Sequence, residues 1–433
     1  MSSRWISKCV VLAALSLMAL PVVVFGQTSR LEGMGGLQSD FVKDYTAMFS
    51  YPAQVSNVGN MVYGEFGNNL TTGGTPADRA MGAVLGNLFE GRMGTWALHL
   101  RQTTPEIGRG DNTAGTGAGN SGSDPNTNNN ESFDLMWGKK MGTANVGIRL
   151  NRSFWQSEVS TPTVTTKLAF DPSAGNANQR NLARNIFGLG GGVGFELNPN
   201  TNIDIGLLYQ TRSFENTVSP IGANTNEKED SPTSYVLSGR AMWQWQSNIM
   251  VTPVFKFYSF DLSRQVITTT TTTFTNTLKG WQVGAAGNWS VGSNDLFVLG
   301  AAFVQNKVEQ EENLFTGPLG VDDKEITENL APLLFAALET HVNSWLTLRF
   351  GANKAAFSKL KGDPRVATDN KVEITSTSFD MSLGAGVKVG TLQFDAVVAD
   401  DFYSNLGWLG SGNSSSTTGN GGYFPKVTAT YSF

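Results

Sequence analysis

The chain closes on "YFPKVTATYSF", residues 423–433, and this stretch decides the fold. Its last eight residues alternate strictly, with Val427, Ala429, Tyr431 and Phe433 on one side and Lys426, Thr428, Thr430 and Ser432 on the other. A period of two predicts a strand with one apolar and one polar face. What the apolar face borders is decided by the rest of the chain.

The same alternation recurs along the chain, in runs close to the ten or so residues with which a tilted strand spans a bilayer. Clear examples are residues 96–101, 146–151, 203–207, 346–350, 379–389 and 392–398. Short connections at 139–145, 198–202, 246–248, 291–295, 342–344 and 389–391 alternate with long ones at 103–131, 155–184, 213–233, 262–277, 307–328, 358–373 and 402–422. Short turns at one rim and long loops at the other predict an outer-membrane barrel with its short turns in the periplasm.

The fold class expected is therefore all-β, a transmembrane antiparallel up-and-down β-barrel at residues 58–433. Counting strands from Val58 gives sixteen. Fourteen is the alternative, because the first hairpin is the least secure. A soluble β-sandwich with tryptophans in its core is the competing interpretation, and the loop asymmetry and the strand number argue against it.

Composition and the N-terminus support secretion. Residues 1–26 carry Arg4 and Lys8 before an apolar run and end on Gly26, which predicts a cleaved signal peptide, with a membrane anchor as the alternative. Cys9, the only cysteine, lies inside it, so disulfide and thiol chemistry are excluded from the mature chain. Its removal leaves 29 basic residues against 36 acidic ones, which argues against nucleic acid as a partner.

Residues 27–57 lack strand periodicity and form a separate N-terminal segment. The residues concerned are Gly33, Met34, Gly35 and Gly36, then Asp44, Ala47, Tyr51, Pro52 and Ala53. They resemble the N-terminal plug of the long-chain fatty-acid transporter family, with Tyr51 in the place where those chains usually carry asparagine. The resemblance implies a segment folded into or under the barrel, with Gly33, Gly35, Gly36 and Pro52 as its motif. A disordered periplasmic leader is the alternative.

The function expected is a channel or transporter for small compounds. Alternation directs charged side chains of both signs into the lumen, so strong ion selectivity is not implied. The candidate pore-lining residues are Arg101, Arg149, Asp204, Arg240, Lys256, Arg349, Asp380 and Asp395. The resemblance adds a hydrophobic substrate and gating by the plug. A structural barrel, a scaffold or adhesin acting through its long loops, and a component of a secretion apparatus remain the alternatives.

Enzymatic chemistry has little support. His99 and His341 are the only histidines, and neither has a catalytic partner nearby in sequence, so we expect no enzyme, no metal and no cofactor. The glycine-rich stretch 187–196 is followed by a turn rather than a helix, so we interpret it as a strand whose glycines let neighbours pack closely. The carboxylates of residues 306–329 lack the spacing of a calcium loop and are interpreted as a solvated loop.

Aromatic residues at the C-terminus and near the strand ends suggest further partners of the barrel. Tyr431 and Phe433 resemble the C-terminal signal that barrel-assembly machinery recognises in outer-membrane proteins. Tryptophans near strand ends, such as Trp137, Trp243 and Trp345, are typical of a membrane interface, so lipid and lipopolysaccharide are the expected surroundings.

Pro253 lies inside the alternating stretch "NIMVTPVFKFY" and has no N–H for a strand ladder. The sequence therefore predicts a broken or bulged ladder there. Its consequence is either a harmless bulge near the periplasmic rim or a lateral gap through which an apolar substrate leaves the lumen.

Overall fold

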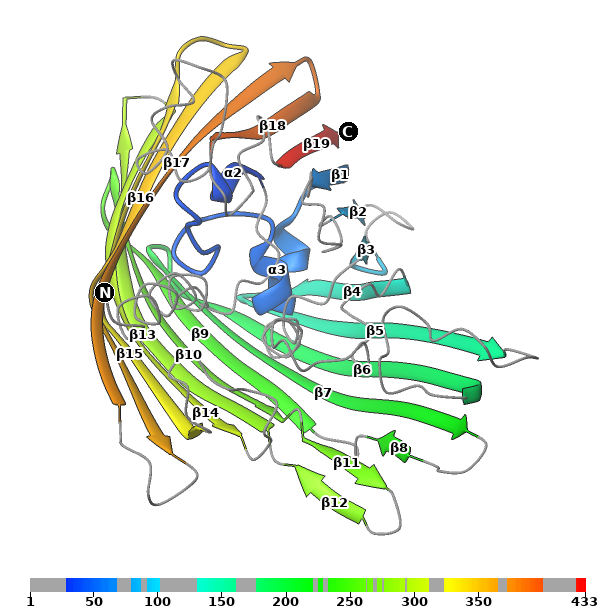
Figure 1. The fold of residues 1–433 in the computed structure, drawn as a ribbon. Helices are drawn as coiled ribbons and strands as arrows, with labels where there is room; N and C mark the ends of the chain where they lie inside the picture. The colour runs from blue at the N-terminus through cyan, green and yellow to red at the C-terminus, as the bar shows by residue number, and fades with distance from the viewer. Residues whose placement is uncertain are drawn as a thin grey trace, which may run out of the picture.

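The computed structural model describes residues 29–67, 79–86, 92–101, 131–160, 177–220, 225–228, 233–261, 263–267, 271–274, 276–292, 294–310, 323–364, 372–399 and 426–433. They form a closed antiparallel β-barrel of sixteen main strands (Figure 1). The predicted fold class and strand count are confirmed. The signal peptide predicted at 1–26 lies outside the described residues.

The strands of the wall differ in length. They are β1 (Met61–Gly67), β2 (Arg79–Leu85), β3 (Thr95–Arg101), β4 (Glu131–Met141), β5 (Ala144–Ser160), β6 (Ala177–Asn198), β7 (Thr201–Pro220), β9 (Thr233–Gln246), β10 (Ile249–Asp261), β13 (Asn276–Val291), β14 (Asp295–Gln310), β15 (Asp323–His341), β16 (Leu346–Pro364), β17 (Val372–Val389), β18 (Leu392–Ala399) and β19 (Lys426–Ser432). Short strands β8 (Thr225–Lys228), β11 (Arg264–Ile267) and β12 (Thr271–Phe274) extend the long-loop side. The N-terminal part holds α2 (Ser29–Glu32), α3 (Ala47–Ser50) and the 3-10 helix η1 (Pro52–Asn57).

Pairing between the first and last strands closes the barrel. β1 lies antiparallel to β19 from Met61 opposite Ser432 to Gly67 opposite Lys426, and it pairs on its other side with β2. The C-terminal strand is therefore not a free sheet edge, because both of its neighbours bond to it.

Several strands are longer than the sequence suggested. β6 runs for 22 residues and β7 for 20, so they enter the ranges expected as long connections. β16 likewise continues to Pro364. The largely polar residues of these ranges extend the hairpins beyond the apolar part of the wall, and the alternation of short and long connections is retained.

The two faces of the wall differ in chemistry, as the period of two requires. Exposed outward side chains are apolar, including Leu98, Ile148, Leu189, Leu207, Phe255, Leu299, Leu334, Leu348 and Phe394. Buried side chains of the inner face are largely polar, including Arg101, Asp134, Arg149, Asn151, Gln210, Gln282, Asn306 and Arg349. An apolar outside and a polar inside invert the usual pattern of a soluble protein, and they suit a barrel surrounded by lipid.

Pro253 lies at a gap in the pairing between β9 and β10. Val251 is opposite Trp243 and Val254 is opposite Arg240, while Thr252 and Pro253 have no partner on β9. The register is the same on both sides of this gap, and the register shift of this strand pair lies between Ile249 and Met250. On the other side of β10, pairing with β13 continues through Pro253 opposite Ala285.

Within the described part of the chain, no helix is both long enough and apolar enough to cross a membrane.

Candidate functional site: the lumen and the N-terminal segment

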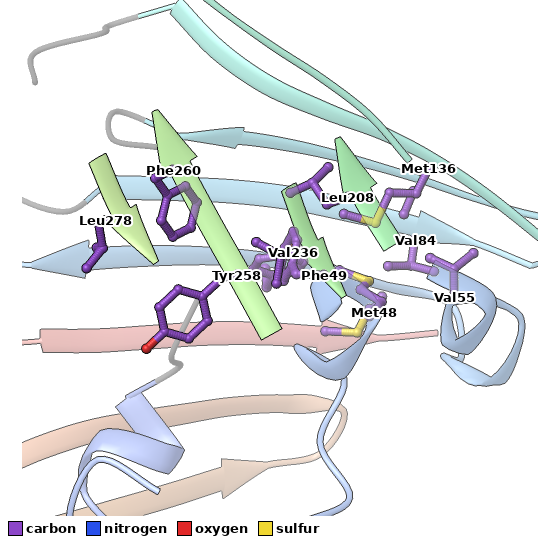
Figure 2. Packing of buried hydrophobic residues seen from close by; sticks show 13 residues of the cluster. Met48, Phe49, Val55, Val84, Met136, Leu208, Val236, Tyr258, Phe260 and Leu278 are labelled. Carbon is purple, nitrogen blue, oxygen red and sulfur yellow. The ribbon is translucent and has the colours of Figure 1, made fainter. Parts of the chain in front are cut away.

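Residues 29–57, the part of the N-terminal segment that the structure describes, pack against the inner face of the wall (Figure 1). Around Leu31, Leu37 and Phe41 they form one apolar cluster with Val254, Val298 and Phe335, among others, from β10, β14 and β15. Around Met48, Phe49 and Val55 they form a second cluster with inward side chains of β1 to β4, β7, β9, β10 and β13, including Val84, Met136 and Val236 (Figure 2). The segment therefore has apolar contacts on opposite sides of the barrel.

Arg30 is the centre of a charge network on one side of the lumen. It bonds Asp44 at 2.9 Å within the segment and Glu339 of β15 at 2.8 Å. Arg349 bonds both Glu339, at 2.6 Å, and Asp395 of β18, at 2.7 Å. Burial alone would lower the pKa of Arg30, but Glu339 and Asp44 outweigh it and raise that pKa, so Arg30 stays charged.

Asp40 makes the most enclosed ion pair of the segment. Its Oδ2 lies 2.5 Å from Nζ of Lys256, and both side chains are buried. Burial raises the pKa of Asp40, but the charges of Lys256 and Arg240 outweigh burial and hold that pKa below its ordinary value. A buried pair of this kind contributes little by itself, whereas removing one partner leaves an uncompensated charge and is strongly destabilising.

Arg240 and Arg149 hold the segment through its backbone. Arg240 bonds Asp204 at 2.9 Å, donates to the carbonyl of Ser39 at 2.9 Å and covers the ring of Tyr51 at 4.6 Å. Arg149 bonds Asp134 at 2.8 Å and donates to the carbonyl of Phe49 at 2.9 Å. Both arginines also bond carboxylates of the wall. Arg149 satisfies a carbonyl in the last turn of α3, whereas Arg240 satisfies one in the connection between α2 and α3.

The first turn of the segment is bound to the last strand. Ser29 and Thr428 share a hydrogen bond between their hydroxyls at 2.8 Å, and Lys426 bonds Glu32 at 2.8 Å. With the contacts above, the segment bonds to strands distributed around the circumference of the barrel.

Inward-facing glycines of the wall are the positions at which the segment approaches most closely. A Cβ added to Gly206 would lie 2.0 Å from the carbonyl oxygen of Ser50, one at Gly147 would lie 2.2 Å from that of Pro52, and one at Gly351 would lie 1.9 Å from the carbonyl carbon of Met34. Gly192, in the stretch expected to pack closely, likewise meets Pro52, at 2.9 Å. The segment backbone therefore lies directly on the sheet. Glycine at the inward phase of a strand was the sequence signal for these contacts.

Two motif glycines of the segment take part in the same packing. Gly33 approaches the Cα of Gly384, and Gly35 approaches the backbone of Ala352 and has a φ of 78° that favours glycine. Gly36 also has a positive φ, at 67°.

Seven of the eight candidate pore-lining residues are buried, and Asp380 is half-buried. Arg149, Arg240 and Lys256 meet the segment directly, and Asp204 does so through Gln54 at 2.6 Å. Arg101 bonds Asp134, while Arg349 and Asp395 join the network of Arg30. In this arrangement the seven buried residues are partners in ion pairs rather than an open charged lining.

The two histidines have separate partners among the described residues. His99 is buried, is hydrogen-bonded to the hydroxyl of Tyr63 at 2.7 Å and packs edge-on against Phe49 at 4.7 Å. His341 is exposed near a short turn, with Nδ1 at 3.7 Å from Asp295. No cluster of metal-ligating side chains is present in the part of the chain that the structure describes.

An apolar strip interrupts the polar inner face on one side. Its inward side chains are Leu208 of β7, Val236 of β9, Tyr258 and Phe260 of β10, and Leu278 of β13. All are buried, and they continue into Met48 and Phe49 of the segment (Figure 2). The hydroxyl of Tyr258 donates to Asn306 on β14. Sequence reasoning missed this strip because it belongs to four strands, each contributing one or two residues.

A second apolar feature lies at the wall itself. A cavity of about 940 Å³ is lined by outward residues such as Phe66, Met81 and Leu100 and also by inward residues such as Glu65 and Arg101. It lies against the wall where β1 to β3 are only seven residues long.

Comparison with known proteins gives structural similarity at low identity. No family model matches the sequence, and no curated protein matches it. A FadL homologue from Pseudomonas aeruginosa is 12% identical, with a TM-score of 0.42 and coverage of 94% of this chain and 98% of that one. The Pseudomonas putida toluene transporter TodX is 9% identical, with a TM-score of 0.38 and coverage of 86% and 92%. CdiB from Escherichia coli is 9% identical, with a TM-score of 0.40 and coverage of 87% of this chain and 63% of that one.

The resemblance to the FadL-like group is confirmed as a likeness of overall structure at low identity. What the FadL homologue, TodX or CdiB carries or assembles is a property of those proteins, and at these identities it does not transfer to this chain.

Proposed function

We propose that the protein is an outer-membrane channel for small hydrophobic compounds, closed by its N-terminal segment acting as a plug. The apolar strip of Leu208, Val236, Tyr258, Phe260 and Leu278 carries this proposal. Its side chains are buried in the closed form, where they belong to one cluster with Met48 and Phe49, so movement of the plug would uncover an apolar surface inside a lumen whose other side chains are largely polar.

The chemistry of the strip selects the substrate class. Each Å² of apolar surface removed from water contributes about 25 cal/mol, so a small hydrocarbon gains several kcal/mol on entering such a site. Hydrophilic solutes gain nothing there. A water-filled porin has no need of a continuous apolar strip on its inner face.

The wall supports a membrane location. Its apolar outward side chains suit lipid, and the pairing of β1 with β19 closes the ladder among the strands that the structure describes. The N-terminal sequence supports export by a signal peptide.

The plug is tested by deleting residues 27–57, with the signal peptide retained, and comparing conductance in planar bilayers with that of the full chain. We expect larger and more frequent openings, because contacts around the circumference are lost while the strand ladder is kept. Circular dichroism checks that the deleted form keeps its strand content. Unchanged conductance of a folded barrel would contradict the plug.

The substrate class is tested by Phe260→Ser combined with Leu278→Ser. Cells carrying this variant should take up a monoaromatic hydrocarbon more slowly than the parent, with no change for a hydrophilic solute of similar size. Ser153→Ala is the matched control, because Ser153 is also inward and fully buried but lies on β5, outside the strip. An equal decrease in the uptake of both solutes, or no decrease for either, would contradict a hydrophobic substrate.

A further inference from the structure

A second cavity, of about 520 Å³, lies on the outward face of β3, β4 and β5. Outward side chains of Leu135, Ile148 and Leu150 make it apolar. Trp96 and Trp137, which are directly opposite each other on β3 and β4, line it together with Arg92 and Lys139. Among the described residues that line it, the charged side chains are those of Arg92 and Lys139, so apolar surface and positive charge meet at one site.

The turn that carries Arg92 is fixed against the wall. The carbonyl of Met93 accepts hydrogen bonds from the indole of Trp137 at 2.7 Å and from that of Trp96 at 3.2 Å. The carbonyl of Arg92 accepts one from Nζ of Lys139 at 3.0 Å. Gly94 permits this approach, because its φ is 74° and a Cβ there would lie 2.6 Å from the carbonyl oxygen of Gly138.

The site also has a defined depth along the barrel. Lys139 lies two residues before the end of β4 at Met141, next to the short turn that leads to β5. Paired tryptophans and cations beside an apolar surface are typical of the level at which lipid headgroups meet acyl chains. Lys140, the next residue, bonds Glu196 at 2.5 Å instead.

We propose that this cavity binds one phospholipid of the periplasmic leaflet. Its phosphate lies beside Arg92 and Lys139, which are suited to charge-assisted hydrogen bonds with phosphate oxygens, and an acyl chain lies on Leu135 and Ile148. The proposal rests on the membrane location proposed above, with the short turns in the periplasm. A free phosphate ion would leave the apolar surface unused, which is why we assign the site to a lipid.

The test uses the full-length mature protein purified in detergent. Phosphatidylglycerol with a brominated acyl chain is titrated, and quenching of tryptophan fluorescence reports binding; Trp96→Phe identifies the part of the signal that comes from this site. We expect Arg92→Gln combined with Lys139→Gln to weaken binding about 30-fold, through the loss of two surface cations. Lys140→Gln is the matched control and should bind like the parent.

Equal affinity of the parent and the double variant would overturn the proposal. Displacement of the lipid by inorganic phosphate alone would overturn it as well, because the apolar part would then contribute nothing. Preferential displacement by lipopolysaccharide would place the site in the other leaflet. If the double variant fails to fold, Arg92→Gln alone carries the test, since Arg92 is exposed in a turn. Hydrocarbon uptake is measured in parallel and should not change, so failure of the lipid site and failure of the channel are distinguishable.

Discussion

Gly206→Ala should loosen the N-terminal segment without opening the wall. The new Cβ would lie 2.0 Å from the carbonyl oxygen of Ser50, whereas ordinary contact begins at about 3.4 Å, so the two must separate by about 1.4 Å. The sheet cannot supply this movement, because β7 is hydrogen-bonded to β6 and β9 on either side. The segment must therefore move.

The expected cost follows from overpacking, which is about 1–3 kcal/mol for one added methyl group in a tight contact. Neighbouring bonds are strained with it, since Arg149 donates to the carbonyl of Phe49 and Gln54 donates to Asp204 within a few residues of Ser50. If this cost falls only on the form in which the segment packs against the wall, the population of the form in which the segment is displaced increases about 5- to 150-fold.

Single-channel recording in planar bilayers measures this increase as open probability, with the deletion of residues 27–57 as the upper limit. Gly239→Ala is the control, because its Cβ would meet nothing closer than the carbonyl oxygen of Asp204 at 3.9 Å. Equal open probability for the two alanine variants would refute the reasoning. It would mean that the segment is not held against Gly206 in the membrane.

Three further outcomes are expected. Asp40→Asn leaves Lys256 without its 2.5 Å partner, so seating of the segment should lose about 3–5 kcal/mol and conductance should rise, while adding Lys256→Met should restore closure. Because the pKa of Asp40 is held below its ordinary value of 3.8, its contribution to closure by the segment is fully present above that pH and is lost only as pH falls through the lowered pKa. Conductance of the parent should therefore stay constant from pH 8 to about pH 4 and rise below it. A rise between pH 8 and pH 5 would assign the closure to another group. Pro253→Val should leave hydrocarbon uptake unchanged, because the register of β9 and β10 is the same on both sides of Pro253. Gly64→Trp fills the cavity beside β1 and should slow that uptake. The reverse result would place a lateral exit at Pro253.

The fold could be predicted from local sequence because the alternation of apolar and polar residues is visible within each barrel strand. Side chains of Val427, Ala429 and Tyr431 alternate with Lys426 and Thr428 whatever their partners are, and lipid on one side and a lumen on the other preserve that alternation in every strand. Strand number and the order of short and long connections follow by counting. Strand ends were less well predicted, because polar residues continue a hairpin such as β6 and β7 beyond the membrane without changing the period.

The arrangement inside the lumen was decided by closure of the barrel. Asp40 and Lys256 are 216 residues apart, and Ser29 and Thr428 are 399 apart. Alternation predicts that Lys256 faces inward, but it contains nothing about which inward residues of other strands lie at the same height or which part of the N-terminal segment reaches them. Those pairings depend on strand register and on the circumference of the closed sheet. For the same reason the sequence does not distinguish Gly206 from the other glycines among its 49. Only the tertiary structure shows that Ser50 lies against the wall at this position.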